Sequence, residues 1–297
     1  NLYDRKKMKK FIILIPIYND WESLEKLLNE INSSVENIKN TQFDCVIIDD
    51  CSTIKNLKIN IPPQINSIKI IHMSKNKGHA RCNAFGIKYL SENEVFDHLI
   101  LMDGDGEDRP QEIKLLVDKI LQDSNKSVVA KRVKRSEGYG FQLLYKLHKY
   151  LTLLTTGKLI NFGNYSCLTK ADIKTLSTKA SLWSSFSGSF KKNINNYNEV
   201  NSERGLRYFG PSKMSIFKLI IHSLSIIAVF KYRVFFSSAI LLTSLYYLET
   251  LIKFNFLLFQ ILIVLFNILI FIVSFRESKK ELENSQLDVA HIDNLTH

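Results

Sequence analysis

Two aspartates separated by a single glycine follow a short apolar run in the middle of the chain. The run 99-LIL-101 leads into 102-MDGDGEDRPQEI-113, where twelve residues include five acidic side chains and two glycines. Asp103 and Asp105 in this arrangement can offer carboxylate oxygens to a hard divalent cation, Mg²⁺ or Mn²⁺. Such a cation would bind phosphate oxygens and neutralise a departing diphosphate. The competing interpretation is an ordinary acidic turn without a ligand.

Three more polar segments also follow predicted strands: 15-IPIYND-20, 48-IDDCS-52 and 74-SKNKGHA-80. The ring of Tyr18 offers a surface on which a base can stack, and Asp50 can accept a hydrogen bond from a base N–H or a ribose hydroxyl. Ligands of open α/β sheets bind outside the carboxyl ends of the strands. The four segments together therefore predict a nucleotide-binding cleft with one metal-binding loop at its rim.

The elements that must position these segments alternate between β and α over residues 1 to about 210. Short apolar, β-branched runs predict strands, and amphipathic stretches at helical spacing predict helices. This alternation predicts an α/β domain with a mostly parallel sheet. The expected strands are 11–17, 45–49, 68–73, 98–103 and 127–132, and the expected helices are 20–35, 79–92 and 110–122.

The C-terminal part of the chain is much more apolar. Residues 234–252 carry one charge, Glu249, and residues 254–275 carry none, so each segment is long enough to cross a hydrocarbon core of ~30 Å. Only Lys253 separates the two, which predicts a hairpin. Basic residues at both outer ends predict that both termini lie in the cytoplasm. The alternative is a helical hairpin buried in a soluble core.

Two stretches, 139–157 and 212–230, mix aromatic residues and leucines with lysine and histidine. This composition favours helices that lie in the membrane interface, although ordinary core helices would fit as well. The expected organisation is a catalytic domain over 1–210 that includes the interfacial helix 139–157, a juxtamembrane amphipathic helix over 211–233, two transmembrane helices over 234–275, and a charged cytoplasmic tail over 276–297.

The formal net charge of +11 suits a nucleic acid, an anionic lipid or a phosphorylated substrate. No helix-turn-helix, zinc-finger or RNA-binding signature is visible, so a nucleic-acid role is not expected. A P-loop is also absent, which argues against ATP hydrolysis. The four cysteines are scattered without a CxxC pair and are expected to be free thiols.

The motifs carry a family resemblance. In order and spacing, 15-IPIYND-20, 49-DDCST-53, 76-NKGHARCNAFGI-87 and 103-DGDGEDRP-110 resemble the motifs of family-2 glycosyltransferases with the GT-A fold. The two apolar spans and 204-RGLRYFGPSKM-214 are similar to the branch that contains dolichyl-phosphate mannose synthase and the polyprenyl-phosphate glycosyltransferases.

The resemblance and the turn chemistry together assign candidate roles. Asp103 and Asp105 would hold the metal and the diphosphate, with Glu107 as a further contact. Arg204, Arg207 and Lys213 belong to a basic segment that would close over the phosphates. The expected nucleotide-binding residues are Pro16, Tyr18, Asp20, Asp50, Asn76, Gly78 and Arg81. The expected acceptor-side residues are Asp108, Arg109, Lys131, Arg132 and Asn164.

One position departs from the pattern of the polyprenyl branch. Where that branch usually has a "GDFRL" segment, this chain has 163-GNYSCL-168, with Asn164 at the Asp position and Ser166 at the Arg position. An asparagine cannot act as a general base. An ionised lipid phosphate needs no strong base, but a hydroxyl acceptor would need one, and the nearest candidates are Glu107, Asp108 and Glu112. A purely structural hydrogen-bonding role for Asn164 is the alternative.

The resemblance implies a metal-dependent, inverting transfer of a sugar from a nucleotide-diphosphate sugar to a polyprenyl-phosphate-type lipid at the bacterial inner membrane. The chain would be a multi-pass protein with its catalytic domain on the cytoplasmic side, and it would form a homo-oligomer through its membrane helices. Two other functions stay open: transfer to a saccharide or other hydroxyl, and an inactive membrane-anchored sugar-nucleotide binder.

Overall fold

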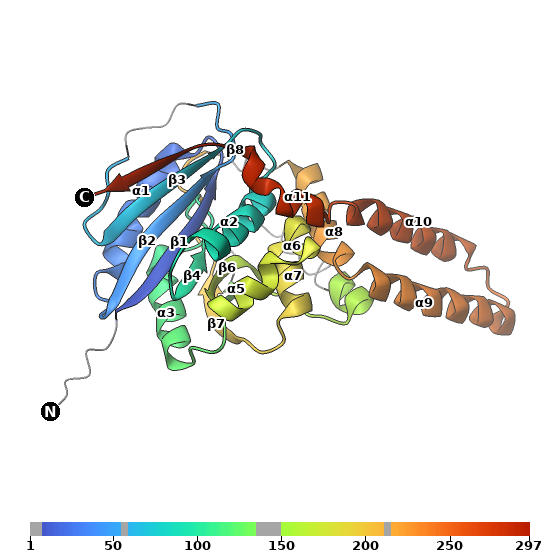
Figure 1. Ribbon diagram of the computed structural model, residues 1–297. Helices are drawn as coiled ribbons and strands as arrows, with labels where there is room; N and C mark the ends of the chain where they lie inside the picture. The colour runs from blue at the N-terminus through green and yellow to red at the C-terminus, as the bar shows by residue number, and fades with distance from the viewer. Residues whose placement is uncertain (1–7, 55–58, 135–149, 211–214) are drawn as a thin grey trace.

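The computed structural model describes residues 8–54, 59–134, 150–210 and 215–297. Over these residues the chain forms one eight-stranded sheet in the order β7-β5-β6-β4-β1-β2-β3-β8 (Figure 1). β1, β2, β3 and β4 run parallel, β6 is antiparallel to β4 and β5, and β8 is antiparallel to β3. The predicted α/β domain with a mostly parallel sheet is confirmed. The strands are β1 (Lys9–Ile17), β2 (Thr41–Asp49), β3 (Ile65–Met73), β4 (His98–Leu101), β5 (Val128–Lys134), β6 (Phe162–Thr169), β7 (Asn198–Glu203) and β8 (Val289–Thr296).

Helices cover both faces of this sheet, which explains why the central strands are apolar without alternation. Every residue of β1 from Phe11 to Ile17 is buried. One face packs against α1 (Trp21–Val35) and α3 (Ile113–Gln122), which follows the short 3₁₀ turn Pro110–Glu112. The other face packs mainly against α2 (His79–Asn93), α5 (Lys170–Ser177), α6 (Ala180–Ser184) and α7 (Phe186–Asn193).

The strand order reverses direction at β1. The chain proceeds outward from β1 to β2 and β3, then returns to add β4 on the other side of β1. In open α/β sheets this switch point opens a crevice at the carboxyl ends of the two strands. The ends of β1 and β4 carry Asp20 and the acidic loop that begins at Asp103, so the topology places both at the crevice.

Three apolar helices follow β7: α8 (Ile216–Ala228), α9 (Lys231–Ile252) and α10 (Leu257–Ser274). α9 and α10 project together away from the sheet (Figure 1). Both are long and apolar enough to cross a membrane, and the apolar window of α9 is 0% buried. That exposure argues against the alternative of a hairpin buried in a soluble core.

The segment after α10, expected to be a charged cytoplasmic tail, is folded onto the sheet. It makes the short helix α11 (Lys279–Glu283) and the 3₁₀ turn Ser285–Asp288, and then adds β8 to the edge of the sheet. Sequence reasoning did not predict this strand, because its mixture of polar and apolar residues gives little strand signal. Its pairing with β3, more than two hundred residues earlier, is a tertiary contact.

The predicted interfacial helix 139–157 lies partly outside the described residues. Residues 150–156 are helical, and Tyr150 and Leu154 are exposed. α8 likewise exposes Phe217 and Ile220. Exposed apolar side chains on two helices beside the hairpin fit an interfacial placement, which stays a prediction.

The buried His98 at the start of β4 is expected to make the stability of the fold sensitive to acid. Burial lowers the pKa of His98 to about 4, so the unfolded chain takes up its proton first as the pH falls. Stability is therefore complete above about pH 6.5 and decreases as the pH falls toward 4. In acid-unfolding curves followed by circular dichroism, His98→Phe is expected to lose less stability than the wild type over this window. An equal loss in both proteins would assign the acid sensitivity to other groups.

Candidate active site

Hydrogen bonds and close packing against β1 hold the acidic loop after β4 in place. Asp103 accepts a hydrogen bond on Oδ1 from Asn164 Nδ2 at 2.9 Å, and its backbone N–H donates to Asp108 Oδ2 at 3.0 Å. Asp105 Oδ1 accepts from the backbone N–H of Glu107 at 3.1 Å. Gly104 lies so close to β1 that an added Cβ would meet the Pro16 carbonyl oxygen at 3.0 Å. These contacts fix the two aspartates at the crevice between β1 and β4.

The basic segment after β7 packs directly onto this loop. The backbone N–H of Gly205 donates to the Glu107 carbonyl at 2.8 Å, and that of Tyr208 donates to the Asp105 carbonyl at 3.0 Å. The Tyr208 ring lies over Gly106, which has a φ of +86°. We call residues 204–209 the closing segment. The segment was expected to cover the site, and the structure places it against the acidic loop.

Two arginines of the closing segment bind the carboxylates of the site. Arg207 bridges two of them, donating through Nη1 to Asp105 Oδ2 at 2.8 Å and through Nη2 to Asp20 Oδ2. Arg204 pairs with Glu107. A guanidinium matches carboxylate and phosphate oxygens equally well. Both arginines are therefore placed where they could move from the carboxylates to a bound diphosphate. Lys213 lies outside the described residues.

The carboxylates of the loop raise one another's proton affinity. Burial, together with the charges of Asp103 and Glu107, raises the pKa of Asp105 to about 6. Burial and the charge of Asp103 raise the pKa of Asp108 to about 8, against a lowering effect of Arg132. A site that concentrates negative charge in this way favours a cation. The arrangement is ready to bind a divalent ion or a positively charged side chain.

Asp108 was expected on the acceptor side of the site, but it is buried. It is 5% exposed, and its side chain accepts a hydrogen bond from the backbone N–H of Asp103. The neighbouring Arg109 pairs with Glu203 at 3.8 Å, and its carbonyl accepts from the buried Tyr165 hydroxyl. The sequence shows that these residues are polar but not which of them the fold buries.

Residues 76–81, which we call the nucleotide turn, are held by Asp50. Both carboxylate oxygens accept backbone N–H groups, Oδ1 from Lys77 at 2.8 Å and Oδ2 from Gly78 at 2.7 Å. Asn76 donates to the Asp50 carbonyl at 3.1 Å, and Gly78 has a φ of +89°. Asp50 is 3% exposed. Its expected hydrogen bond with a base N–H or a ribose hydroxyl stays a prediction, and the structure shows that both its oxygens also support the backbone of the turn.

The C-terminal segment also supports this turn, which sequence reasoning missed. The backbone N–H of Ser74 donates to the Asp288 carbonyl at 2.7 Å, and the Asp288 carboxylate pairs with Lys77. Arg81, at the start of α2, donates to the Lys77 carbonyl at 3.3 Å and lies over the Trp183 ring. Because Asp288 follows both apolar helices, the nucleotide turn is completed only after the chain returns from them.

The remaining predicted residues lie at different places around the crevice. Tyr18 is exposed at the end of β1, as a base-stacking ring requires. Arg132 lies against Gly163, the neighbour of Asn164. The guanidinium is so close that a Cβ added at Gly163 would clash with Arg132 Nη2. Lys131 is adjacent to Arg132 on the same strand and therefore points to the opposite face, where it pairs with Glu199 at 3.4 Å. Arg132, but not Lys131, is thus brought to the acidic loop.

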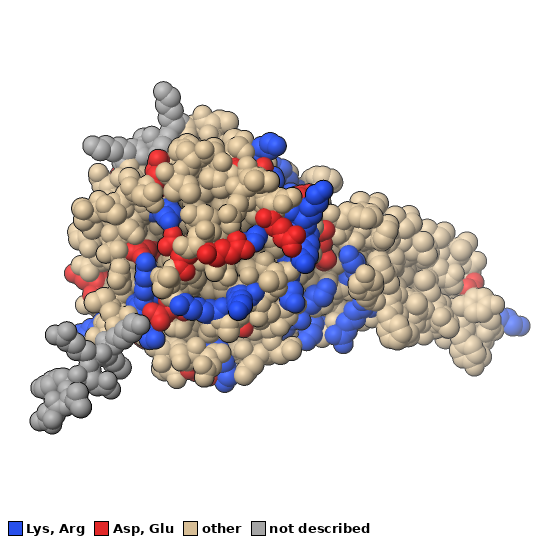
Figure 2. All heavy atoms as spheres, in the orientation of Figure 1, with Lys and Arg blue, Asp and Glu red and all other residues tan. Residues whose placement is uncertain are grey.

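Figure 2 shows the resulting charge pattern: acidic and basic side chains lie side by side in a band across the globular part. On the same face, the surface of the projecting hairpin carries almost no charge along its length (Figure 2). Basic residues lie at the base of the hairpin, where α9 begins with Lys231 and Arg233 follows. The molecule therefore combines a charged crevice with an apolar extension.

The residues present fit a divalent cation. Asp103 and Asp105 offer oxygen ligands, which Mg²⁺ and Mn²⁺ prefer. Asn164 orients the first carboxylate and the Glu107 N–H orients the second. The Arg207 guanidinium on Asp105 Oδ2 shows that this oxygen faces a position where positive charge is stabilised.

The contact between Gly106 and Tyr208 predicts a specific lesion. An added Cβ at Gly106 would meet the Tyr208 ring at 2.4 Å, whereas at Gly210, with a φ of +64°, it would meet nothing within 4 Å. Both glycines have positive φ, so alanine is strained at either position. Gly106→Ala is expected to weaken nucleotide binding, measured as Kd by calorimetry, about tenfold more than Gly210→Ala. Equal Kd values for the two variants would show that the closing segment does not need to dock on the loop.

Comparison with known proteins identifies the class of this fold and site. Residues 12–186 match the family model described as glycosyl transferase family 2. The chain belongs to this family, as the motifs indicated. The matched range includes the acidic loop, the nucleotide turn and Asn164, but ends before the closing segment.

The chain also resembles curated members of one branch. It is 27% identical over 174 residues to the undecaprenyl-phosphate 4-deoxy-4-formamido-L-arabinose transferase of Salmonella choleraesuis strain SC-B67, covering 57% of this chain and 50% of that protein. The transferase of the same name from Salmonella paratyphi B strain ATCC BAA-1250 / SPB7 matches to the same extent. The chain thus spans about half the length of the curated relatives it matches.

Solved structures with the same fold include glucosyl-3-phosphoglycerate synthase from Mycobacterium tuberculosis. Its complex with Mn²⁺, UDP-glucose and phosphoglyceric acid aligns with a TM-score of 0.52 at 14% identity, covering 76% of this chain and 80% of that chain. Its complex with Mn²⁺, UDP and phosphoglyceric acid gives a TM-score of 0.54 at 14% identity, covering 76% and 78%. This likeness confirms the predicted GT-A fold.

Proposed function

We propose that the protein transfers a sugar from a nucleotide-diphosphate sugar to the phosphate of a polyprenyl-type lipid at a membrane. The observation that carries the proposal is the crevice at the β1–β4 switch point, where Asn164 orients Asp103 and Arg207 of the closing segment binds Asp105. Membership of glycosyl transferase family 2 supports the reaction class. The curated relatives are undecaprenyl-phosphate 4-deoxy-4-formamido-L-arabinose transferases, which supports a lipid-phosphate acceptor.

The donor would bind with its nucleoside beside Tyr18 and the turn braced by Asp50. Asp103 and Asp105 would hold Mg²⁺ or Mn²⁺, which would supply positive charge to the leaving diphosphate. Arg204 and Arg207 would shift from the carboxylates to the diphosphate oxygens. Docking of the closing segment over the loop would exclude water, which protects the donor from hydrolysis.

Transfer would proceed as one displacement with inversion at the anomeric carbon. A lipid phosphate oxygen forms the new bond to that carbon as its bond to the diphosphate oxygen breaks, and the nucleoside diphosphate leaves. The lipid phosphate is ionised and carries its own nucleophile. The chain therefore needs to orient the donor diphosphate and the lipid phosphate, and Arg132, which lies against Gly163 next to Asn164, would bind the lipid phosphate.

Two of the three carboxylates that could serve a hydroxyl acceptor are engaged within the fold. Glu107 pairs with Arg204 and would be released only when Arg204 shifts to the diphosphate. Asp108 is buried and accepts the Asp103 N–H. Glu112 accepts from the Ser202 hydroxyl at 2.6 Å and from the backbone N–H of Glu203 at 3.0 Å. Together with Asn164, this arrangement favours an acceptor that needs no general base over a saccharide.

The placement of the C-terminal segment supports the proposed topology. β8 joins the same sheet as the catalytic residues, so the chain must return to its starting side after α9 and α10. Two crossings satisfy this requirement. At 1.5 Å per residue, the 22 residues of α9 extend about 33 Å, enough for a bilayer core. The inner bacterial membrane, the cytoplasmic position of the domain and association through the hairpin remain predictions.

Cell fractionation tests the membrane part separately from the chemistry. The full chain is expected in the membrane fraction, resistant to carbonate washing, and protease added to inside-out vesicles is expected to cleave the catalytic domain. Release of the chain by carbonate, or protection of that domain in such vesicles, would contradict the proposed placement.

A further inference from the structure

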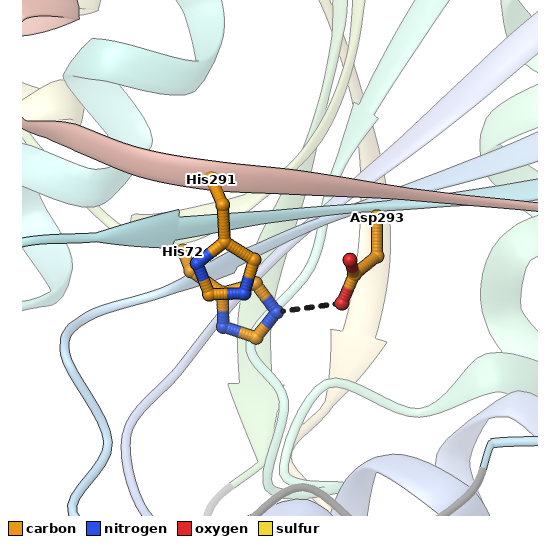
Figure 3. A group of neighbouring side chains, drawn as sticks. All are labelled: His72, His291 and Asp293. Carbon is orange, nitrogen blue, oxygen red and sulfur yellow. Dashed lines mark hydrogen bonds and ion pairs between the residues drawn. The ribbon is translucent and has the colours of Figure 1, made fainter.

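A second polar cluster lies at the other edge of the sheet, on neighbouring strands β2, β3 and β8. Asp49 is the register partner of His72, and His72 is the register partner of His291. Asp293 lies two residues beyond His291, so both side chains project from the same face of β8. Figure 3 shows His291 and Asp293 reaching from β8 toward His72. The ligating atoms of His72, His291 and Asp293 all lie within 4.8 Å of one another.

His72 has a carboxylate at each of its ring nitrogens. Nδ1 lies 2.8 Å from Asp49 Oδ2, and Nε2 lies 3.3 Å from Asp293 Oδ2. A neutral imidazole has a single N–H. When Nδ1 donates it to the buried Asp49, the Nε2 lone pair faces a carboxylate oxygen, and two acceptors oppose each other. A cation between Nε2 and Asp293 would remove this conflict.

The hydrogen bond to Asp49 is the support that a metal-binding histidine requires. Histidine ligands typically donate their second ring N–H to a carboxylate, which fixes the tautomer and the ring orientation. Asp49 and His72 are both buried, so this pair is held rigidly inside the sheet. The unprotonated Nε2 of His72 then points toward Asp293 on β8.

His291 completes a set of three ligands. Its ring lies nearly parallel to that of His72, with a centroid distance of 4.1 Å and an interplanar angle of 12°. Because an imidazole binds a metal in the plane of its ring, the exposed His291 side chain would turn away from this stacked position to share the ion with His72. The Asp293 side chain is 47% exposed, so an ion can enter from solvent. Two imidazoles and one carboxylate suit Zn²⁺ with a water as fourth ligand. Nitrogen ligands disfavour Mg²⁺ and Mn²⁺, in contrast to the all-oxygen loop at Asp103 and Asp105.

We propose that His72, His291 and Asp293 bind one zinc-class transition-metal ion that fastens the C-terminal strand to the sheet. Asp49 acts as the positioning residue for His72. The fastened strand begins directly after Asp288, whose carboxylate and carbonyl hold the nucleotide turn at Lys77 and Ser74. The ion would therefore stabilise both the edge of the sheet and the segment that supports this turn. This site does not depend on the proposed transfer reaction.

Zinc binding by the full-length chain in detergent tests the site. The protein is first freed of metal with a chelator, and Mg²⁺ is kept in excess throughout so that it occupies the acidic loop. The wild type is expected to bind one Zn²⁺ more than His291→Ala and Asp293→Asn, as measured by equilibrium dialysis with elemental analysis. His297→Ala is the matched control, because it removes a histidine one residue beyond β8 that bonds to the Ile65 carbonyl rather than to the cluster.

The melting temperature gives an independent measurement. Zn²⁺ at one hundred times its Kd is expected to raise the Tm of the wild type and of His297→Ala by roughly 5 °C. His291→Ala and Asp293→Asn, which alter exposed side chains, should fold normally and show no rise. Equal zinc stoichiometry and an equal Tm change in all four proteins, or no zinc bound by the wild type, would overturn the proposal.

Discussion

Asp105→Asn is expected to lower sugar transfer by about 10³-fold or more while leaving the fold intact. The substitution keeps the size of the side chain, and the amide oxygen can still accept the Glu107 N–H. It removes the negative charge that would hold the divalent cation and that now binds Arg207 at 2.8 Å. The departing diphosphate would then lose the positive charge of the cation that Asp105 helps to hold, which costs catalysis several kcal/mol. Initial rates of label transfer in membranes measure the effect.

Asp118→Asn provides the matched control for this substitution. Asp118 lies on α3, is partly exposed and pairs with Lys114 four residues away, so its loss changes the same charge on the surface at little cost. Both variants should keep the wild-type Tm. If Asp105→Asn retained more than a tenth of wild-type activity, the acidic loop would not be the metal and diphosphate site.

Arg207→Ala is expected to give the second largest effect, a loss of about 10² to 10³-fold, mainly in kcat. Arg207 bridges Asp20 and Asp105, and its guanidinium would move from these carboxylates to the diphosphate of the donor. Hydrogen bonds to charge that develops in the transition state are worth ~3–4 kcal/mol each. Steady-state kinetics against the donor separates the change in kcat from the change in KM.

Arg207→Lys distinguishes charge from geometry at this position. Lysine keeps the positive charge but lacks the planar fork that contacts two oxygens at once. We expect it to restore part of the lost rate and to fall between the wild type and the alanine variant. A lysine variant as slow as the alanine variant would mean that the fork is essential. Wild-type rates in both variants would show that Arg207 only neutralises the charge of the acidic loop.

Local patterns predicted the parts of the site that lie at strand ends. The runs 11–17 and 98–103 are apolar without alternation, which is the signature of central parallel strands, and each is followed by polar residues. Because carboxyl ends of parallel strands share one edge, Asp20 and Asp103 could be placed in one crevice from sequence. The switch between β1 and β4 explains why that reasoning worked.

The contacts that depend on long-range docking could not be predicted. Asp50 and Asp108 are typical of exposed ligand-binding carboxylates in sequence, yet the fold buries both to brace backbone N–H groups. Asn164 suggested an altered acceptor site, and its bond to Asp103 shows that it also orients the acidic loop. The acceptor consequence of this asparagine remains a prediction.

The transfer assay with a lipid-phosphate acceptor tests the central claim most directly. Membranes that contain the full chain are given Mn²⁺ or Mg²⁺, undecaprenyl phosphate and each of a panel of radiolabelled UDP- and GDP-sugars, with Asp105→Asn as control. We predict label in the lipid fraction with one donor, abolished in the variant and by chelation. Release of nucleoside diphosphate without lipid labelling would contradict the lipid acceptor, and no product with any donor of the panel would contradict the proposed transferase.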